Sequence, residues 1–87
     1  MSYDTLHQCN VMHIKNISDY VQLVRKNDAV VFYQKRIKMA QYNKLKNIAG
    51  HHRTFFIIDN NKDNLPSITY DDWLELVNQY KKTFTWK

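Results

Sequence analysis

The chain has 87 residues, a formal net charge of +5 and a single cysteine. This length fits one small domain over residues 1–87 and leaves no room for a second hydrophobic core. One cysteine excludes an internal disulfide framework and a cysteine-rich zinc site, and it suits a reducing compartment. No apolar run approaches the roughly 18 residues of a membrane span, and the N-terminus lacks the features of a signal peptide. We therefore expect a cytoplasmic protein, in the host cytoplasm if it is viral, with no membrane partner.

The first third of the chain predicts two strands around a short helix. The polar residues 1–8 indicate a loose end, and residues 9–14 are the first extended candidate. Ser18 is a suitable N-cap for a helix over residues 19–26. The β-branched and aromatic run over residues 29–33 is typical of a strand that is covered on both faces, and we place it at the centre of the sheet.

The middle of the chain switches to helical spacing and then back to a strand. Apolar residues recur at helical spacing between residues 35 and 49, and Gly50 follows where a helix C-cap is expected. Residues 54–58 form a second buried-strand pattern. Residues 59–64 are polar and predict a turn, and Pro66 excludes a central strand there.

The last helix is expected to begin near Thr69, because Thr69 and Asp72 have the spacing of a capping box. Apolar side chains follow at helical spacing: Trp73, Leu76, Val77, Tyr80 and Phe84. The fold class is therefore α/β, a β-α-β-α-β-α order with a mostly parallel three-strand sheet. Without the first strand, the same elements would give an α+β fold.

Charge is distributed unevenly along the chain. Residues 35–53 contain no acid and six cations: Lys35, Arg36, Lys38, Lys44, Lys46 and Arg53. Residues 59–79 reverse the sign, with five acids opposed by Lys62 alone. A cationic segment of this kind attracts phosphates or acidic proteins.

This basic segment is the first candidate site. Ligands of parallel sheets lie beyond the carboxyl ends of the strands, and Lys35 and Arg36 are expected there, at a helix N-terminus that also favours anions. Single-stranded RNA is expected to extend along the helix. The predicted nucleic-acid or anion-binding residues are Lys35, Arg36, Lys38, Tyr42, Lys44, Lys46, His51, His52 and Arg53. The alternative is a solvated basic helix that keeps the protein soluble.

His51 and His52 are candidates for proton transfer in phosphodiester cleavage, because imidazole titrates near neutral pH. Adjacent side chains in an extended segment point to opposite faces, however, so both rings would not reach one phosphate. The sequence also lacks phosphate-loop, nucleophile-elbow and metal-ligand motifs. We expect no enzyme, no cofactor and no metal site.

Two further residues have alternative roles. Cys9 is interpreted as a small buried hydrophobe. Trp86, next to the C-terminal residue, either folds back onto the sheet or stands out as an anchor for a partner protein or for a homo-oligomer.

Residues 11–59, from Val11-Met12-His13-Ile14 through Asp28-Ala29-Val30-Val31-Phe32-Tyr33 to Phe55-Phe56-Ile57-Ile58-Asp59, resemble the first half of thioredoxin-like domains. The resemblance implies a redox-active cysteine pair where the central strand enters the long helix. That stretch reads Gln34-Lys35-Arg36-Ile37-Lys38 and contains no cysteine. A domain of this kind would be unable to perform thiol exchange.

Together these features predict a small basic accessory protein without catalytic activity, which binds RNA or a nucleic-acid-handling host factor and acts as a stoichiometric inhibitor. The abundance of Asn and Lys and the small size favour a bacteriophage source. The alternative is a redox-inactive thioredoxin-like module that presents Trp86 and the acidic last helix to a partner protein.

Overall fold

A computed structural model describes residues 3–87 of the chain. Within these residues four strands and three helices alternate: β1 (Tyr3–Asn10), α1 (Ile17–Val21), β2 (Ala29–Gln34), α2 (Met39–Ala49), β3 (Arg53–Ile58), α3 (Tyr70–Gln79) and β4 (Tyr80–Thr85). The strands form one sheet in the order β3-β2-β1-β4, and every neighbouring pair is parallel. The predicted α/β class is confirmed, but the sheet has a fourth strand that the sequence did not predict.

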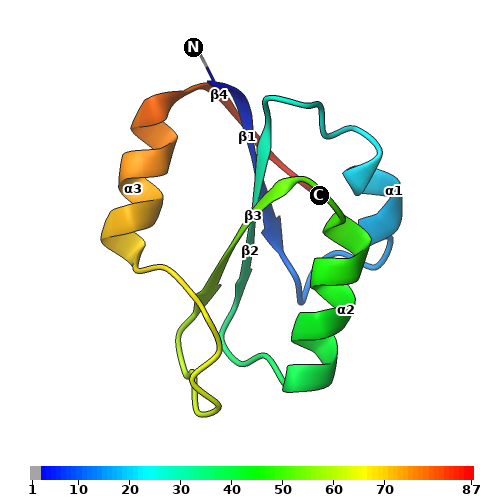
Figure 1. Cartoon of the computed structure of the whole chain (residues 1–87), viewed down its shortest axis with the longest axis vertical. Helices are drawn as coiled ribbons and strands as arrows, with labels where there is room; N and C mark the ends of the chain where they lie inside the picture. The colour runs from blue at the N-terminus through cyan, green and yellow to red at the C-terminus, as the bar shows by residue number, and fades with distance from the viewer. Residues whose placement is uncertain (1–2) are drawn as a thin grey trace.

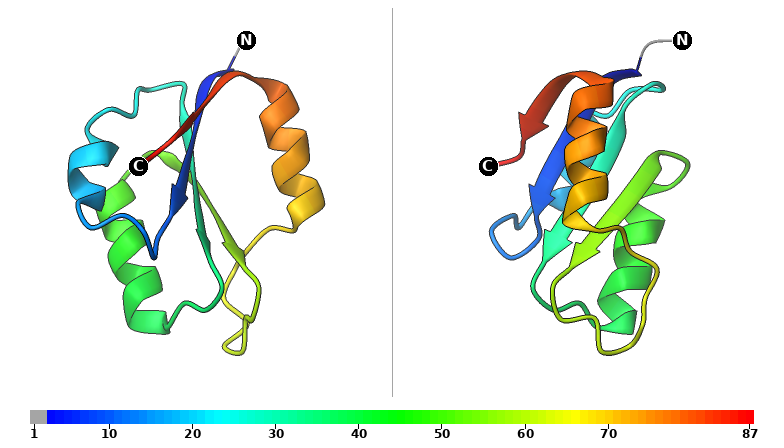
Figure 2. Two further views of the ribbon diagram at one scale, coloured as in Figure 1. Left: turned by 180° about the vertical axis from the view of Figure 1, so that it is seen from behind. Right: turned by 90° about the vertical axis from the view of Figure 1, so that its left-hand side faces the viewer.

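The sheet is the middle of three layers. Helices α1 and α2 cover one face, and α3 covers the other (Figure 1). All four strands run in the same direction, so their carboxyl ends meet at one edge of the sheet (Figure 2). We call this the carboxyl edge and the opposite one the amino edge.

Strand β2 has the buried environment that its apolar run predicted. Val30 and Phe32 pack into the cluster on the side of α1 and α2, whereas Ala29 and Val31 pack into the cluster on the side of α3. All four side chains are fully buried. An interior strand covered by helices on both faces needs apolar residues at every position, which is why alternation is absent here.

The first strand is real but lies earlier than predicted. Residues 9–14 were expected to form it, whereas β1 spans Tyr3–Asn10 and pairs with both β2 and β4. The predicted loose end is therefore wrong for residues 3–8, and residues 1–2 lie outside the described part of the chain. The strand was predicted at the wrong position because β1 buries a polar side chain, His7, which has hydrogen-bond partners inside the protein.

Two helices differ from their predicted bounds. Helix α1 is shorter than expected and begins at Ile17 with Asn16, not Ser18, at the N-cap position. Helix α2 begins at Met39, so residues 35–38 form a loop. This loop buries Ile37 in the cluster on the side of α1 and α2. Gly50 follows α2 with φ 60°, a value that favours glycine.

Helix α3 begins as predicted and ends earlier. Thr69 Oγ1 accepts a hydrogen bond from the Asp72 N–H, and the Asp72 side chain accepts one from the Thr69 N–H, so the capping box is confirmed. The predicted helical positions Tyr80 and Phe84 belong instead to β4, which extends the sheet beside β1. Within residues 3–87, no helix is long and apolar enough to cross a membrane.

Candidate functional site

Three aromatic rings gather at the carboxyl edge on the side of α3. Tyr33 comes from the end of β2, and Tyr70 and Trp73 come from the first turn of α3. The centroid of the Trp73 ring lies 6.0 Å from that of Tyr33 and 6.1 Å from that of Tyr70, and both pairs are stacked. Tyr70 is 54% exposed, although large apolar rings are usually withdrawn from water. We call these three residues the aromatic cluster.

Asp59 fixes the two tyrosines of the aromatic cluster. The Tyr33 hydroxyl donates a hydrogen bond of 3.0 Å to Asp59 Oδ2, and the Tyr70 hydroxyl donates one to Asp59 Oδ1. The hydrogen bond to Asp59 raises the pKa of Tyr70 above its ordinary value. Because both carboxylate oxygens are used by the hydroxyls, Asp59 acts here as a support for the rings.

Asn60 joins the aromatic cluster to the basic loop before α2. Its backbone N–H donates to the Lys35 carbonyl at 2.8 Å. With its amide oxygen turned toward Arg36, Asn60 also accepts hydrogen bonds from Arg36 Nε and Nη2 at 3.2 and 3.3 Å. The side chains of Lys35 and Arg36 are exposed. Lys35 and Arg36 are therefore connected to the aromatic cluster at the carboxyl edge through the consecutive residues 59 and 60.

A small cavity of about 220 Å³ adjoins the aromatic cluster on the side of α3. It is lined by Gln8, Cys9, Asn10, Tyr33, Trp73 and Thr85. The Trp73 indole N–H donates to Gln8 Oε1 at 2.9 Å, which ties α3 to β1 across the cavity wall. Its volume is below the 300–1,000 Å³ that is typical of pockets for drug-sized ligands, so it suits a single small planar group.

The remaining predicted residues of α2 do not form one surface. Lys38 occupies the N-cap position of α2 and is exposed, close in sequence to Lys35. Lys44 and Lys46 lie two residues apart on the helix and line two different cavities, Lys44 beside α1 and Lys46 beside β3. Since residues two apart on a helix do not share a face, Lys44 and Lys46 do not belong to one continuous binding surface.

Tyr42 is not available for stacking with a base. Its ring is 5% exposed, and its hydroxyl donates to the Pro66 carbonyl at 2.9 Å. The Phe56 ring packs against it at a centroid distance of 4.2 Å, and Lys46 lies over the ring at 5.6 Å. In this structure the ring belongs to the packing between α2 and β3 and does not offer the free face that the predicted RNA contact through Tyr42 needs.

His51, His52 and Arg53 lie at the amino edge, at the start of β3. Five residue steps of about 3.3 Å separate Arg53 from the carboxyl end of the strand, roughly 17 Å. The predicted basic segment is therefore divided between the two edges of the sheet. The group that adjoins the aromatic cluster contains Lys35 and Arg36, with Lys38 following in the same loop.

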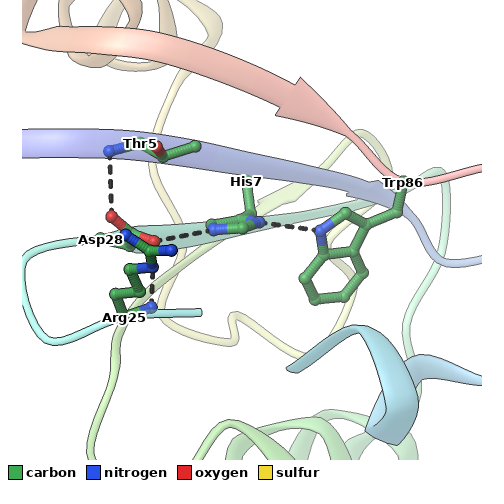
Figure 3. Close-up of polar contacts among 5 residues, drawn as sticks. All are labelled: Thr5, His7, Arg25, Asp28 and Trp86. Atoms are coloured by element: carbon green, nitrogen blue, oxygen red, sulfur yellow. Dashed lines mark hydrogen bonds and ion pairs between the residues drawn. The ribbon is translucent and has the colours of Figure 1, made fainter. Parts of the chain in front are cut away.

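Trp86 has folded back, the first of its two alternatives. Its ring is 2% exposed, stacks on Tyr20 at 5.1 Å and donates its indole N–H to His7 Nδ1 at 3.0 Å. His7 Nε2 in turn contacts Asp28 Oδ2 at 3.0 Å, so a buried line of hydrogen bonds anchors the end of the chain (Figure 3). A ring held in this way offers a partner protein no exposed anchor.

The single cysteine of the chain lies in the interior of the described structure. Cys9 is fully buried, as predicted, and burial raises the pKa of its thiol to about 12. A thiol with so high a pKa is not ionised at neutral pH and is a poor nucleophile. Within residues 3–87, no three His, Cys, Asp or Glu side chains come together to hold a metal ion.

The aromatic cluster was missed by the sequence analysis. Trp73 was placed on the buried face of a helix, and Tyr33 was assigned to the buried strand. The available signal was the position of Tyr33 and Asp59, which end or directly follow neighbouring parallel strands. Because the carboxyl ends of such strands meet at one edge, this pair could have indicated the site.

None of the family models, curated proteins or solved structures that were compared with this chain matches it. The thioredoxin-like resemblance of residues 11–59 therefore stays a prediction.

Proposed function

We propose that this protein binds single-stranded RNA at the carboxyl edge of its sheet, without catalysing a reaction. The observation that carries the proposal is the hydrogen-bonded connection of the aromatic cluster, through Asp59 and Asn60, to the exposed cations Lys35 and Arg36. Proteins that bind single strands combine rings on which bases stack with cations that follow the backbone.

Base stacking is assigned to Tyr70. It is the most exposed of the three rings, and Asp59 and Trp73 hold it in place. A ring that is already fixed loses little conformational entropy when a base stacks on it. Stacking is worth about 1–3 kcal/mol per base, and every base has a face that can stack, so this contact tolerates different sequences.

Phosphate binding is assigned to Lys35, Arg36 and Lys38. The loop that carries them leads directly into α2, an 11-residue helix whose first N–H groups add a partial positive charge. The first turn of α2 contains no acidic residue, so the described side chains there do not cancel that charge. Asp59 lies nearby and accepts from the two tyrosine hydroxyls, and its single carboxylate is opposed by the three cations of the loop.

The experiment is a fluorescence-anisotropy titration of a labelled nine-nucleotide oligo(U) at several salt concentrations. Tyr70→Ala should weaken binding about tenfold, because it removes one stacking surface. The double variant Lys35→Gln/Arg36→Gln should flatten the slope of log K against log salt by about 1.4, since each lost phosphate contact to a single strand contributes about 0.7.

The matched control is Lys81→Gln/Lys82→Gln, which removes the same two charges from exposed positions of β4. The proposal expects a clearly smaller change in affinity for this control. Equal losses for the two double variants would contradict it, because binding would then depend on net charge alone.

The alternative function, a protein-binding module that presents Trp86, is less well supported. The ring of Trp86 is buried against Tyr20 and His7. The same proposal includes RNA from a host cell as the ligand and inhibition of a host factor as the result of binding. A pull-down with and without ribonuclease would test these two parts.

A further inference from the structure

The cavity beside the aromatic cluster has polar side chains whose orientations are fixed by their neighbours. An indole N–H is only a donor, so the Gln8 atom that faces Trp73 Nε1 at 2.9 Å is the amide oxygen. The Gln8 amide nitrogen therefore faces Thr85 and donates to its Oγ1 at 3.2 Å. Because Thr85 Oγ1 accepts this bond, its own proton is available to donate.

The orientation of Asn10 follows by the same reasoning. The Met12 N–H donates to the side-chain oxygen of Asn10 at 3.2 Å, which identifies that atom as the acceptor. The other end of the amide, Asn10 Nδ2, is then a donor. Asn10 and Thr85 both line the cavity. The residues that line the cavity therefore include two side chains with a donor to offer a ligand, Asn10 from β1 and Thr85 from β4.

The walls of the cavity favour a flat ligand. The rings of Tyr33 and Trp73 supply apolar surface at one side, and the volume of about 220 Å³ is too small for a whole nucleotide cofactor. The ligand that fits is a planar ring whose edge has two neighbouring acceptors. A nucleobase of a bound RNA strand meets this description, and the cavity shares Tyr33 and Trp73 with the surface on which that strand would lie.

Guanine has this edge, since N7 and O6 are neighbouring acceptors. Adenine has N7 beside the N6 amino group, which would place a donor against a donor of the cavity. Cytosine offers N3 and O2, but its single ring covers less of the aromatic wall than a purine does. Stacking strength therefore favours guanine over cytosine.

We propose that the cavity lined by Asn10, Thr85, Tyr33 and Trp73 binds a guanine base, with Asn10 Nδ2 and the Thr85 hydroxyl donating to its N7 and O6. This inference rests on the proposed RNA binding and adds a base preference to it. The protein then prefers single strands that contain an unpaired guanine, while the neighbouring nucleotides are held by stacking and charge.

The test compares nine-nucleotide RNAs of eight uridines with one central base in fluorescence-anisotropy titrations. Guanine at the centre should bind about fivefold or more tightly than adenine or uracil, the lower limit expected of a two-point base contact. Inosine keeps N7 and O6 and should retain this gain. The 7-deaza analogue of guanine replaces N7 by carbon and should lose it.

Two protein variants test the same contacts by removing the proposed donors. Asn10→Asp keeps an oxygen that can accept from Met12 N–H but replaces the donor by an acceptor, so the guanine preference should disappear while oligo(U) is still bound. Thr85→Val keeps the shape of the side chain and should have the same effect. Circular dichroism and thermal melting confirm that each variant is folded.

The outcomes separate the two proposals. Equal affinities for all central bases, or tightest binding of cytosine, would overturn the guanine site and leave RNA binding in place. A guanine preference that both variants retain would overturn it as well. No binding of any of the RNAs at low salt would overturn the proposed function and the guanine site together.

Discussion

At the scale of single residues, the Asp28 carboxylate is a buried charge with three hydrogen-bond donors. It is buried and accepts hydrogen bonds from the N–H groups of Thr5 and Arg25, at 3.0 and 2.9 Å, and from His7. The indole of Trp86 is a donor, so His7 Nδ1 accepts and His7 Nε2 carries the proton that is donated to Asp28. The imidazole is therefore neutral in this arrangement.

Asp28 should make stability depend on pH. Burial raises the pKa of its carboxyl, but the hydrogen bonds from Arg25, His7 and Thr5 outweigh this effect and lower the pKa below its ordinary value. A lowered pKa in the folded state means that Asp28 stabilises the protein above about pH 4, and that this contribution is lost as the pH falls through the folded-state value.

Asp28→Asn should destabilise the protein by about 1–3 kcal/mol at pH 7, because an amide leaves at least one buried donor unpaired. Urea unfolding at pH 7 and at pH 3 measures the effect. The difference between wild type and variant should shrink at the lower pH. A difference that stays constant would show that the charge of Asp28 is not what these hydrogen bonds stabilise.

Trp86→Phe tests the other end of the same line of hydrogen bonds. Phenylalanine fills much of the indole site but has no donor, so His7 Nδ1 is left unpaired at a cost of about 1–3 kcal/mol. Tyr20→Phe is the control, since it keeps the ring that stacks on Trp86 and removes only a hydroxyl that donates to the Lys87 carbonyl at the surface. Equal unfolding midpoints in urea for the two variants would contradict the role of the hydrogen bond.

At the scale of elements, local pattern predicted the interior of the sheet and failed at its ends. Strands β2 and β3 are continuous apolar runs, and their positions were correct to within one residue. Tyr80 and Phe84 continue the spacing of α3 and also suit a strand, and no glycine or proline stops the helix before them. The choice is made by pairing with β1, at the other end of the chain, which no local window contains.

The candidate site was likewise predicted only in part. Its cations were predicted, because an acid-free run is visible in the sequence. The aromatic cluster was not, since Tyr33 and Tyr70 are far apart in the sequence and are joined by Asp59 only in the folded structure. Distances across the sheet edge depend on strand order, which local sequence patterns do not determine.

The capping box of α3 allows an element-scale prediction. Thr69→Ala removes the acceptor for the Asp72 N–H and should destabilise the protein by about 1 kcal/mol. Since the first turn of α3 carries Tyr70 and Trp73, the variant should also bind RNA less tightly. Thr69→Ser keeps the cap and should behave like wild type in urea unfolding and in RNA titrations. If Thr69→Ser lost as much stability and RNA affinity as Thr69→Ala, the cap hydroxyl would not be the cause of the loss.

At the scale of the whole molecule, cations lie at both edges of the sheet. A cavity of about 600 Å³ lies away from the aromatic cluster and is lined by residues that include Arg25, Lys81, Lys82 and Phe84. The Phe84 ring meets His7 edge-on at a centroid distance of 5.8 Å. The surface around this cavity has cations and one exposed ring, Phe84, whereas the carboxyl edge has cations and the aromatic cluster of three rings. We therefore assign RNA to the carboxyl edge in spite of the larger cavity elsewhere.

The most direct test of this assignment uses the two tryptophans as reporters, since one lies in the candidate site and the other is buried beside His7. Their indole N–H signals can be followed by ¹⁵N-edited NMR while single-stranded RNA is added. Binding at the carboxyl edge predicts that the Trp73 signal shifts with saturation and that the Trp86 signal stays in place. A shift of Trp86 together with the backbone signals of Arg25 and Lys82, and none of Trp73, would contradict the assignment and place RNA at the amino edge.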